Sequence, residues 1–166
     1  GEVNGEVEDL RTVIDTDCNL SILTFNDEGG KAAFRHTTSH IMAQAIKRLY
    51  PDTKLAIGPS IADGFYYDVD RETPLTSEDL EKIEAEMKKI VKEDLKLERF
   101  ELPRAEAIAF MKEKEEPYKV ELIEDLPEDA VISFYRQGEF TDLCAGPHLM
   151  STKPVKAFKL TSLAGA

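Results

Sequence analysis

The stretch Phe34–Tyr50, FRHTTSHIMAQAIKRLY, has a helical pattern that ends before Pro51. At about 100° per residue its apolar side chains form one stripe, and His36, His40 and Lys47 fall on nearly the opposite face. We therefore predict a helix that packs its stripe into the core and points two imidazoles, one turn apart, in the same direction. The stripe consists of Ile41, Met42, Ala45, Ile46 and Leu49.

A second stretch, Asp142–His148 or DLCAGPH, holds the last of the three histidines and one of the two cysteines. If Phe140 to Cys144 is a strand, Asp142 and Cys144 face the same side, and Gly146-Pro147 bends the chain before the histidine. We expect this strand to lie beside the start of the helix, so that the two stretches form one site. The side chains expected to converge are His36, His40, Asp142, Cys144 and His148.

Two chemistries are open to such a cluster. Three imidazoles and a thiolate are a suitable ligand set for tetrahedral zinc. The histidines could instead position and deprotonate a water molecule that attacks an ester. A lone histidine on a helix is more often structural than catalytic, but the clustering of every imidazole in the chain favours a functional site.

The rest of the chain mixes short strand patterns with helical ones. Thr76 is a typical N-cap residue, and it opens a long amphipathic helix with Glu78/Lys82 and Glu84/Lys88 as exposed pairs. Because strands and helices do not alternate strictly, we predict an α+β fold, a mostly antiparallel sheet packed with helices. Further strands are predicted at Val13–Ile14, Leu20–Phe25, Leu55–Gly58, Gly64–Val69, Leu97–Leu102, Val131–Tyr135 and Val155–Leu160, and further helices after Pro103 and Pro117.

Composition narrows the functional classes. The 166 residues are 42% hydrophobic and 33% charged, which is typical of a globular protein. The net charge of −12 argues against a freestanding nucleic-acid binder, because lysine and arginine provide most of the affinity for phosphates. No apolar run is long enough for a transmembrane helix, so no membrane partner is expected. Two cysteines in unlike contexts fit a reducing cytoplasm, where we expect the protein to be located.

Several ordered motifs resemble the N-terminal editing domain of bacterial-type threonyl-tRNA synthetases. The resemblance covers roughly residues 30 to 160, and residues 1 to 27 resemble the second half of the small β-grasp (TGS-like) domain that precedes it. We therefore expect a β-grasp remnant at 1–27 and an editing domain of the threonyl/alanyl type at 28–166. The motifs are Arg35-His36-x-x-x-His40, Ala56–Pro59 leading to Gly64–Asp68, Tyr118–Val120, and Asp142-x-Cys144-x-Gly146-Pro147-His148.

The resemblance implies a hydrolase that proofreads serine charged wrongly onto the threonine tRNA. A pocket that holds threonine rejects serine only by the loss of one methyl group, about 1 to 3 kcal/mol, so a second site must destroy the error. By carry-over, the catalytic positions would be His36, Lys119, Asp142, Cys144 and His148. The positions in contact with substrate would be His40, Tyr67 and Gly58.

Roles follow from the same resemblance. His36 would position or activate water, and Lys119 would stabilise negative charge on the intermediate or hold the RNA end. Asp142 would bind the serine ammonium or orient a histidine. Cys144 and His148 would shape the pocket and hold water, and Tyr67 would line the adenosine site.

The resemblance also implies partners and cofactors. The partners would be the 3′ end of tRNA(Thr) carrying serine and the remaining domains of the synthetase, of which this chain would be an excised piece. No cofactor is expected for editing, and no metal ligands are assigned. Zinc is the alternative, because related alanine-specific editing domains use HxxxH and CxxxH sets as ligands. A non-catalytic module that binds tRNA or protein is a third interpretation.

Overall fold

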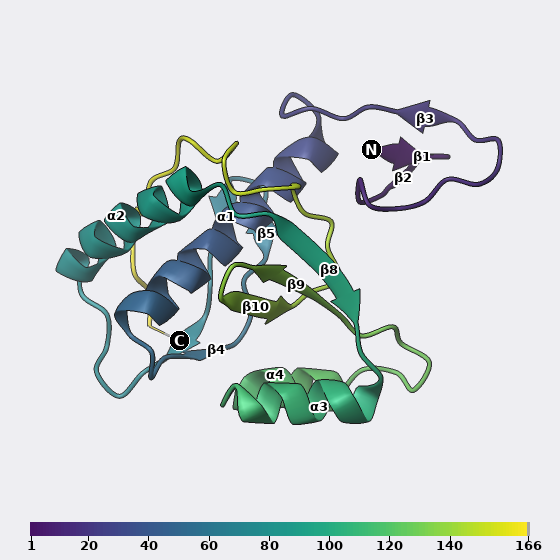
Figure 1. Ribbon diagram of the computed structural model, residues 1–166. Helices are drawn as coiled ribbons and strands as arrows, with labels where there is room; N and C mark the ends of the chain where they lie inside the picture. The colour runs from purple at the N-terminus through teal and green to yellow at the C-terminus, as the bar shows by residue number, and fades with distance from the viewer. Residues whose placement is uncertain (166) are drawn as a thin grey trace.

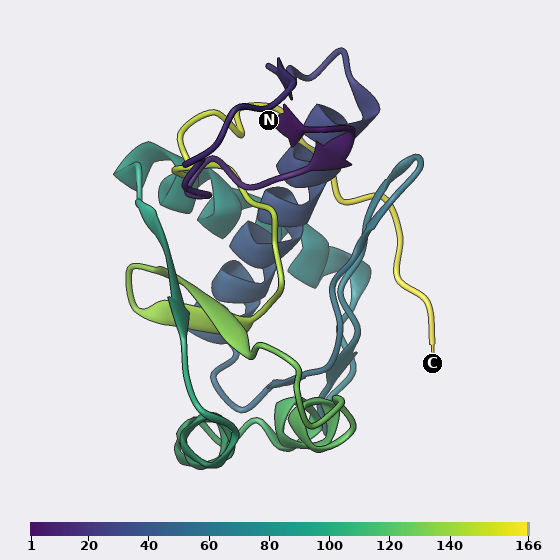
Figure 2. The same ribbon diagram turned by 90° about the vertical axis from the view of Figure 1, so that its right-hand side faces the viewer.

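The central element is helix α1, Glu28–Leu49, in a computed structural model that describes residues 1–165. Figures 1 and 2 show the other elements arranged around it. Its apolar stripe packs into the main core as predicted, with Ile41 fully buried and Ile46 nearly so. The opposite face is not in solvent either, because the helix is buried on all sides from Thr37 to Ile46. The imidazoles on that face therefore point into the protein.

Helix α1 begins earlier than predicted. The residues before Phe34 include Gly29 and Gly30, which suggest a turn in the sequence, but both lie in the first turn of the helix. The structure explains them by close approach, because a Cβ on Gly30 would lie 1.9 Å from the carbonyl oxygen of Thr24. The glycines thus let the preceding segment pack against the helix.

Helix α2, Ser77–Glu93, packs against α1 through Ile83, Met87 and Ile90. Its predicted start is confirmed, because Thr76 and Asp79 form a reciprocal capping box. The prediction that Glu84 pairs with Lys88 on an exposed face is wrong. Glu84 is only 8% exposed, and its carboxylate accepts hydrogen bonds from the Leu160 N–H at 2.6 Å and from Lys159 at 3.1 Å.

A three-stranded antiparallel sheet lies beside α1, with strand order β10-β9-β8. These strands are β8 (Leu97–Glu101), β9 (Ser133–Gln137) and β10 (Phe140–Leu143), and Asp142 pairs with Tyr135. Helices α3 (Arg104–Glu113) and α4 (Pro117–Glu124) form a second core with this sheet, around Met111, Ile123 and Phe134. The sheet supplies Asp142 to the site, and α4 supplies Lys119.

The segment between α1 and α2 forms a long hairpin, which Figure 2 shows on the other side of α1 from β9 and β10. Its pairs are β4 (Lys54–Leu55) with β7 (Val69–Asp70) and β5 (Ser60–Ile61) with β6 (Gly64–Phe65). The regular strands are shorter than predicted. Backbone hydrogen bonds from Ala56 N to Asp68 O and from Asp68 N to Ile57 O nevertheless continue the pairing between them.

The N-terminal residues form a small sheet in the order β2-β1-β3, with β1 at Glu2–Val3, β2 at Glu6–Val7 and β3 at Leu20–Ser21. The predicted strand at Val13–Ile14 is absent, because these side chains are exposed and no neighbouring strand pairs with them in the described residues. The predicted strand at Val155–Leu160 is also wrong. That segment runs along α2, where Glu84 rather than a strand satisfies the Leu160 N–H.

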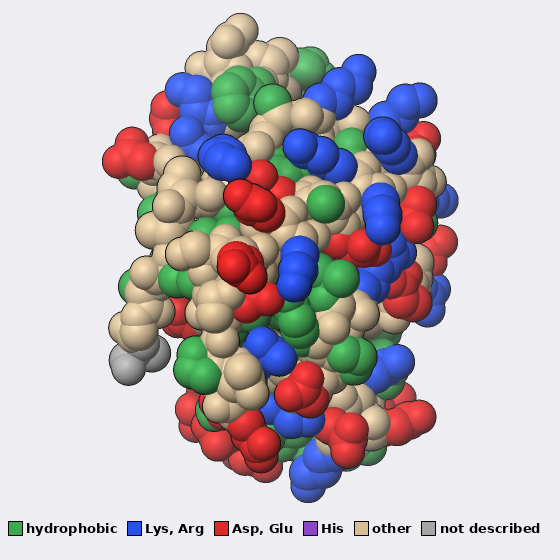
Figure 3. Space-filling model, turned by 90° about the vertical axis from the view of Figure 1, so that its left-hand side faces the viewer, with side chains coloured by type: hydrophobic (Ala, Val, Ile, Leu, Met, Phe, Trp, Pro, Cys, Tyr) green, Lys and Arg blue, Asp and Glu red, His purple; other side chains and the backbone are tan. Residues whose placement is uncertain are grey.

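The predicted fold class, α+β with antiparallel sheets, is confirmed. Among residues 1–165, no helix is long and apolar enough to cross a membrane. Figure 3 shows basic and acidic side chains interspersed over one face of the molecule.

Candidate functional site

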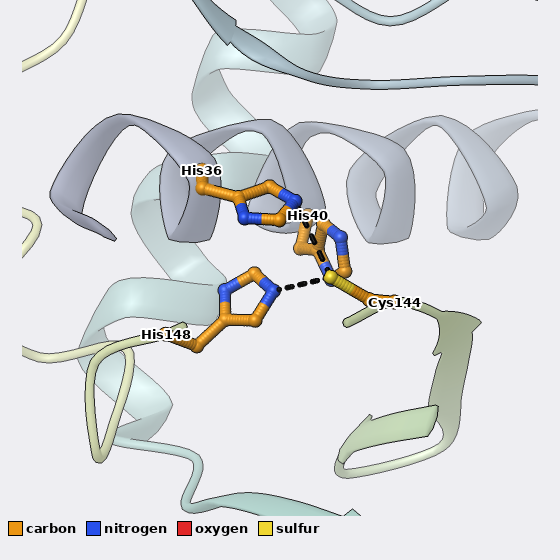
Figure 4. Close-up of side chains that lie close together, drawn as sticks. All are labelled: His36, His40, Cys144 and His148. Atoms are coloured by element: carbon orange, nitrogen blue, oxygen red, sulfur yellow. Dashed lines mark hydrogen bonds between the residues drawn. The ribbon is translucent and has the colours of Figure 1, made fainter. Parts of the chain in front are cut away.

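The two stretches singled out in the sequence meet inside the protein. His36 and His40 come from α1, and Cys144 and His148 come from the segment that follows β10 (Figure 4). The Cys144 Sγ lies 3.1 Å from His148 Nε2 and 3.4 Å from His36 Nε2. The four side chains can each bring one ligand atom to within 4.8 Å of the others. His36 is the partly exposed member, whereas His40, Cys144 and His148 are buried.

Thr37 orients the His148 ring from its Nδ1 side. Its hydroxyl accepts a hydrogen bond from the Leu149 N–H at 3.0 Å and lies 3.0 Å from His148 Nδ1. If the hydroxyl donates its single proton to Nδ1, Nε2 carries the ring proton and donates to the Cys144 sulfur. The thiol also accepts a hydrogen bond from the Gly146 N–H at 3.2 Å.

A buried polar group lies next to this cluster. The Lys119 ammonium is 2.9 Å from Asp142 Oδ1 and donates to the Tyr67 hydroxyl at 2.8 Å. The Tyr67 hydroxyl in turn donates to Asp142 Oδ2, and His40 Nε2 lies 3.5 Å from the same oxygen. Both oxygens of Asp142 are therefore engaged within the protein. This arrangement favours the predicted orienting role of Asp142 over direct binding of a substrate ammonium.

Burial decides the protonation states. It lowers the pKa of His40 well below the usual value, and electrostatic interactions with His36 and with the Lys119 ammonium act in the same direction. The pKa of His148 is also well below its usual value, first because of burial and then because of the neighbouring histidines. Burial lowers the pKa of His36 as well, although the Asp142 carboxylate opposes it. At neutral pH the three imidazoles are unprotonated.

The same burial acts on the acids of the site. It raises the pKa of the Cys144 thiol to about 12, although the Gly146 N–H opposes the shift. It raises the pKa of Tyr67 well above the usual value, and the Asp142 carboxylate adds to this. Cys144 is therefore a neutral thiol and not a thiolate nucleophile.

Gly58 contributes through its backbone and its lack of a side chain. Its carbonyl oxygen accepts a hydrogen bond from Ser39 Oγ at 2.7 Å, which ties the hairpin to α1. A Cβ at this position would lie 2.1 Å from Cδ2 of the Tyr67 ring. Gly58 thus sets the position of Tyr67, and through it the contacts with Lys119 and Asp142.

The donor set fits a metal ion. Zinc is ligated by neutral imidazole and by thiolate, and a bound zinc ion would itself deprotonate the Cys144 thiol. The Nδ1 atom of His40 is buried and makes no hydrogen bond within the described residues, so it is available to a ligand. The residues that would hold zinc are His36, His40, Cys144 and His148.

The residues predicted from the sequence thus lie together at this site. Gly58 is the exception, because it affects the site only through the position of Tyr67. Sequence reasoning missed Thr37, Tyr135, Asp9 and Arg11, which all contact the residues around His148. Thr37 lies within the quoted helix motif and could have been found from its position. Nothing in the sequence pattern connects Asp9 or Arg11 with a histidine so much later in the chain.

Comparisons with known proteins agree with this architecture. The family described as "Threonyl and Alanyl tRNA synthetase second additional domain" matches residues 132–165. The chain is similar over its whole length to a threonine--tRNA ligase of Acetivibrio thermocellus, with 71% identity over 166 residues. It is 70% identical over 164 residues to the corresponding ligase of Clostridioides difficile and 65% identical over 166 residues to that of Caldanaerobacter subterraneus.

The chain spans only about a quarter, 26%, of the length of these relatives, although the matches cover 99% to 100% of the chain itself. The segment matched by the family includes Cys144 and His148, and the similarity to these relatives extends over the part of the chain that contains His36. The chain is therefore similar over its whole length to part of the threonyl-tRNA synthetases, consistent with their N-terminal editing domain.

Proposed function

We propose that this site hydrolyses the ester that joins serine to the 3′ end of mischarged tRNA(Thr). The observation that carries the proposal is the combination of geometry and charge at His36. Its imidazole is partly exposed, is unprotonated because burial lowers its pKa, and lies at the mouth of a cluster whose other members are buried. A neutral, accessible imidazole is the form that accepts a proton from water.

The proposed reaction is direct attack by water. An unprotonated nitrogen of His36 takes a proton as the water oxygen bonds to the ester carbonyl carbon. The tetrahedral intermediate then collapses with cleavage of the bond to the ribose oxygen, which takes the proton back. The products are serine and tRNA with a free terminal hydroxyl.

The other side chains hold the geometry for this step. A thiol whose pKa is raised to about 12 does not supply a thiolate, so Cys144 acts by binding His36 and His148 and not as a nucleophile. The ammonium of Lys119, fixed by Asp142 and Tyr67, stabilises negative charge that develops on the carbonyl oxygen. His40 packs against His36, with ring centroids 5.0 Å apart, and Gly58 sets the position of Tyr67.

The physical need for such a site lies in selection between serine and threonine. Because serine lacks the methyl group of threonine, an aminoacylation pocket binds serine only about 1 to 3 kcal/mol less favourably than threonine. The editing pocket must therefore admit serine and exclude the extra methyl of threonine.

We propose that residues 28–166 form the editing unit and residues 1–27 are part of a β-grasp unit. The other domains of the synthetase would supply most of the grip on tRNA, since this chain has a net charge of −12.

The experiment compares hydrolysis of seryl-tRNA(Thr) and threonyl-tRNA(Thr) under single-turnover conditions, with enzyme at high concentration so that weak tRNA binding does not limit the rate. We expect rapid loss of serine and slow loss of threonine. His36→Ala is expected to reduce hydrolysis by about 10² to 10⁴-fold, the usual contribution of a general base. Hydrolysis by His36→Ala at the wild-type rate would contradict the mechanism, and equal hydrolysis of both esters would contradict the assigned specificity.

Zinc-dependent deacylation, as in the alanine-specific branch, is the second candidate. The observation in its favour is the set His36, His40, Cys144 and His148, whose ligand atoms lie within 4.8 Å of one another. Zinc held by three of these side chains would leave a fourth position open for an activated water. A chelator should leave seryl-tRNA hydrolysis unchanged if the proposed metal-free reaction operates, and it should abolish hydrolysis if zinc is required.

A further inference from the structure

We propose that Asp9 and Arg11, in the N-terminal unit, are positioning residues for His148. In this view the N-terminal unit fixes the geometry of the site and is not merely attached beside it. The inference builds on the proposed deacylase function. It concerns residues that lie outside the histidine and cysteine motifs and outside the segment matched by the family.

The Asp9 carboxylate binds directly to the segment that carries His148. Its Oδ2 accepts hydrogen bonds from the His148 backbone N–H at 3.0 Å and from the Tyr135 hydroxyl at 2.7 Å. The side chain of Asp9 is only 10% exposed. One buried carboxylate oxygen thus joins the N-terminal unit to the site histidine and to a residue of β9.

Arg11 holds the same segment from its carbonyl side. Its guanidinium donates to Leu97 O at 2.6 Å, to Leu149 O at 3.1 Å and to His148 O at 3.5 Å. It also binds Asp9 Oδ1 at 2.7 Å. The fork geometry of arginine allows these simultaneous bonds, which a lysine ammonium reproduces poorly. The backbone of His148 is therefore held at both its N–H and its carbonyl.

The His148 ring is constrained by the same group of residues. Its centroid lies 4.5 Å from that of Tyr135, whose hydroxyl binds Asp9. The Tyr135 hydroxyl also lies against Gly146, where φ is +79° and a Cβ would approach the oxygen to 2.3 Å. A shift of Asp9 would thus move both the backbone and one packing wall of His148. The ring contacts with Thr37 and Cys144 depend on that position.

The Asp9 carboxylate is paired with the Arg11 guanidinium at 2.7 Å in this arrangement. Hydrogen bonds between charged partners are stronger than those between neutral ones. The pair is therefore a firm attachment and not a surface contact of small energy.

The test compares Asp9→Asn with Asp15→Asn in the same chain. Asp15 lies in the same unit and is exposed, so its variant matches the charge change without touching His148. Seryl-tRNA(Thr) hydrolysis gives kcat and KM, and ¹⁵N NMR of the imidazoles reports the His148 environment independently of activity. We expect Asp9→Asn to lower kcat by about tenfold with little change in KM, because small misplacements of a catalytic group are costly. The His148 imidazole signals should shift, and Asp15→Asn should behave as wild type.

Tyr135→Phe is the second variant, for the case in which Asp9→Asn does not fold. It removes one donor to Asp9 and keeps the ring that packs on His148. We expect a decrease of about threefold in kcat and a smaller NMR shift in the same direction. Wild-type kcat in a folded Asp9→Asn variant, or in Tyr135→Phe if Asp9→Asn is unfolded, would overturn the proposal.

The NMR readout separates this proposal from the proposed function. If the wild-type protein hydrolyses no seryl ester, the deacylase assignment fails by itself. Unchanged His148 signals in Asp9→Asn would then overturn the positioning role too, whereas shifted signals would support it.

Discussion

The Lys119 ammonium lies 2.9 Å from the Asp142 carboxylate, and both residues are almost fully buried, at 3% and 2% exposure. The pair joins α4 to β10, and both of its members bind the Tyr67 hydroxyl of the hairpin. Three separate elements are therefore connected through this ion pair. A buried ion pair of this kind affects both stability and chemistry.

Lys119→Met should separate these two effects from each other. It leaves the Asp142 carboxylate buried without its ammonium partner, which typically costs about 3 to 5 kcal/mol of unfolding free energy. Adding Asp142→Asn removes the unpaired charge, so the double variant should regain much of the stability while deacylation stays low. Denaturant unfolding and seryl-tRNA hydrolysis measure the two properties. A double variant as unstable as Lys119→Met would show that the ion pair is not the cause.

Gly58→Ala should disturb the site through Tyr67. Its Cβ would lie 2.1 Å from the Tyr67 ring, so the ring must move away from Lys119 and Asp142. We expect deacylation to fall by about tenfold or more, since such displacements of positioned groups are costly. Gly64→Ala in the same hairpin is the matched control, because no atom lies within 4 Å of its Cβ position. Equal activity in the two variants would argue against a role for Tyr67.

Thr37→Val tests the support behind His148. It keeps the side-chain shape but removes the hydroxyl that binds His148 Nδ1 and accepts from the Leu149 N–H. Each buried polar group left unpaired costs about 1 to 3 kcal/mol, and deacylation should fall with the loss of ring orientation. The neighbouring Thr38→Val is the control, because the Thr38 hydroxyl bonds to Phe34 O within the same helix. Comparable losses in both variants would indicate a general effect of changing the helix.

Glu139 should contribute to stability against acid. Hydrogen bonds from Arg48 lower the pKa of Glu139 to about 2, below the value of about 4.3 for a free glutamate. A depressed folded-state pKa stabilises the protein above the unfolded value, and this contribution is lost as the pH falls through about 4 to 2. Because the Glu139 side chain is 56% exposed, we expect only about 1 kcal/mol.

The measurement is the free energy of unfolding of wild type and Glu139→Gln between pH 6 and pH 2.5. The difference between the two proteins should shrink as the pH falls. Glu128→Gln, a change in an exposed loop, controls for removal of one negative charge. A difference that stays constant over this range would mean that Arg48 does not hold Glu139 as the structure indicates.

Metal content can be tested without an activity assay. We expect protein purified without a chelator or a histidine tag to contain no stoichiometric zinc, in agreement with the proposed metal-free hydrolysis. Elemental analysis of wild type and Cys144→Ser checks this. Stoichiometric zinc in wild type that is lost in Cys144→Ser would favour the zinc-dependent reaction.

Local sequence patterns correctly predicted the elements with regular hydrophobic spacing. The spacing of Ile41, Ala45 and Ile46 indicated the buried face of α1, and Thr76 correctly marked the start of α2. Predictions were wrong where the pattern was apolar but no strand partner existed, as at Val13–Ile14 and Val155–Leu160. A strand requires hydrogen bonds from a neighbour, and a single segment does not show whether that neighbour is present.

The sequence by itself determined that His36 and His40 share one face of a helix, because 3.6 residues per turn brings side chains four apart together. Between Cys144 and His148, in the second stretch, the sequence predicted only that the chain bends at Gly146-Pro147. Only the tertiary structure decided that these pairs meet and that Lys119 neutralises Asp142. It alone placed Asp9 and Arg11 on the backbone of His148. The physical reason is that periodicity acts within one element, whereas a buried charge or N–H is satisfied by whichever distant residue the packed fold brings to it.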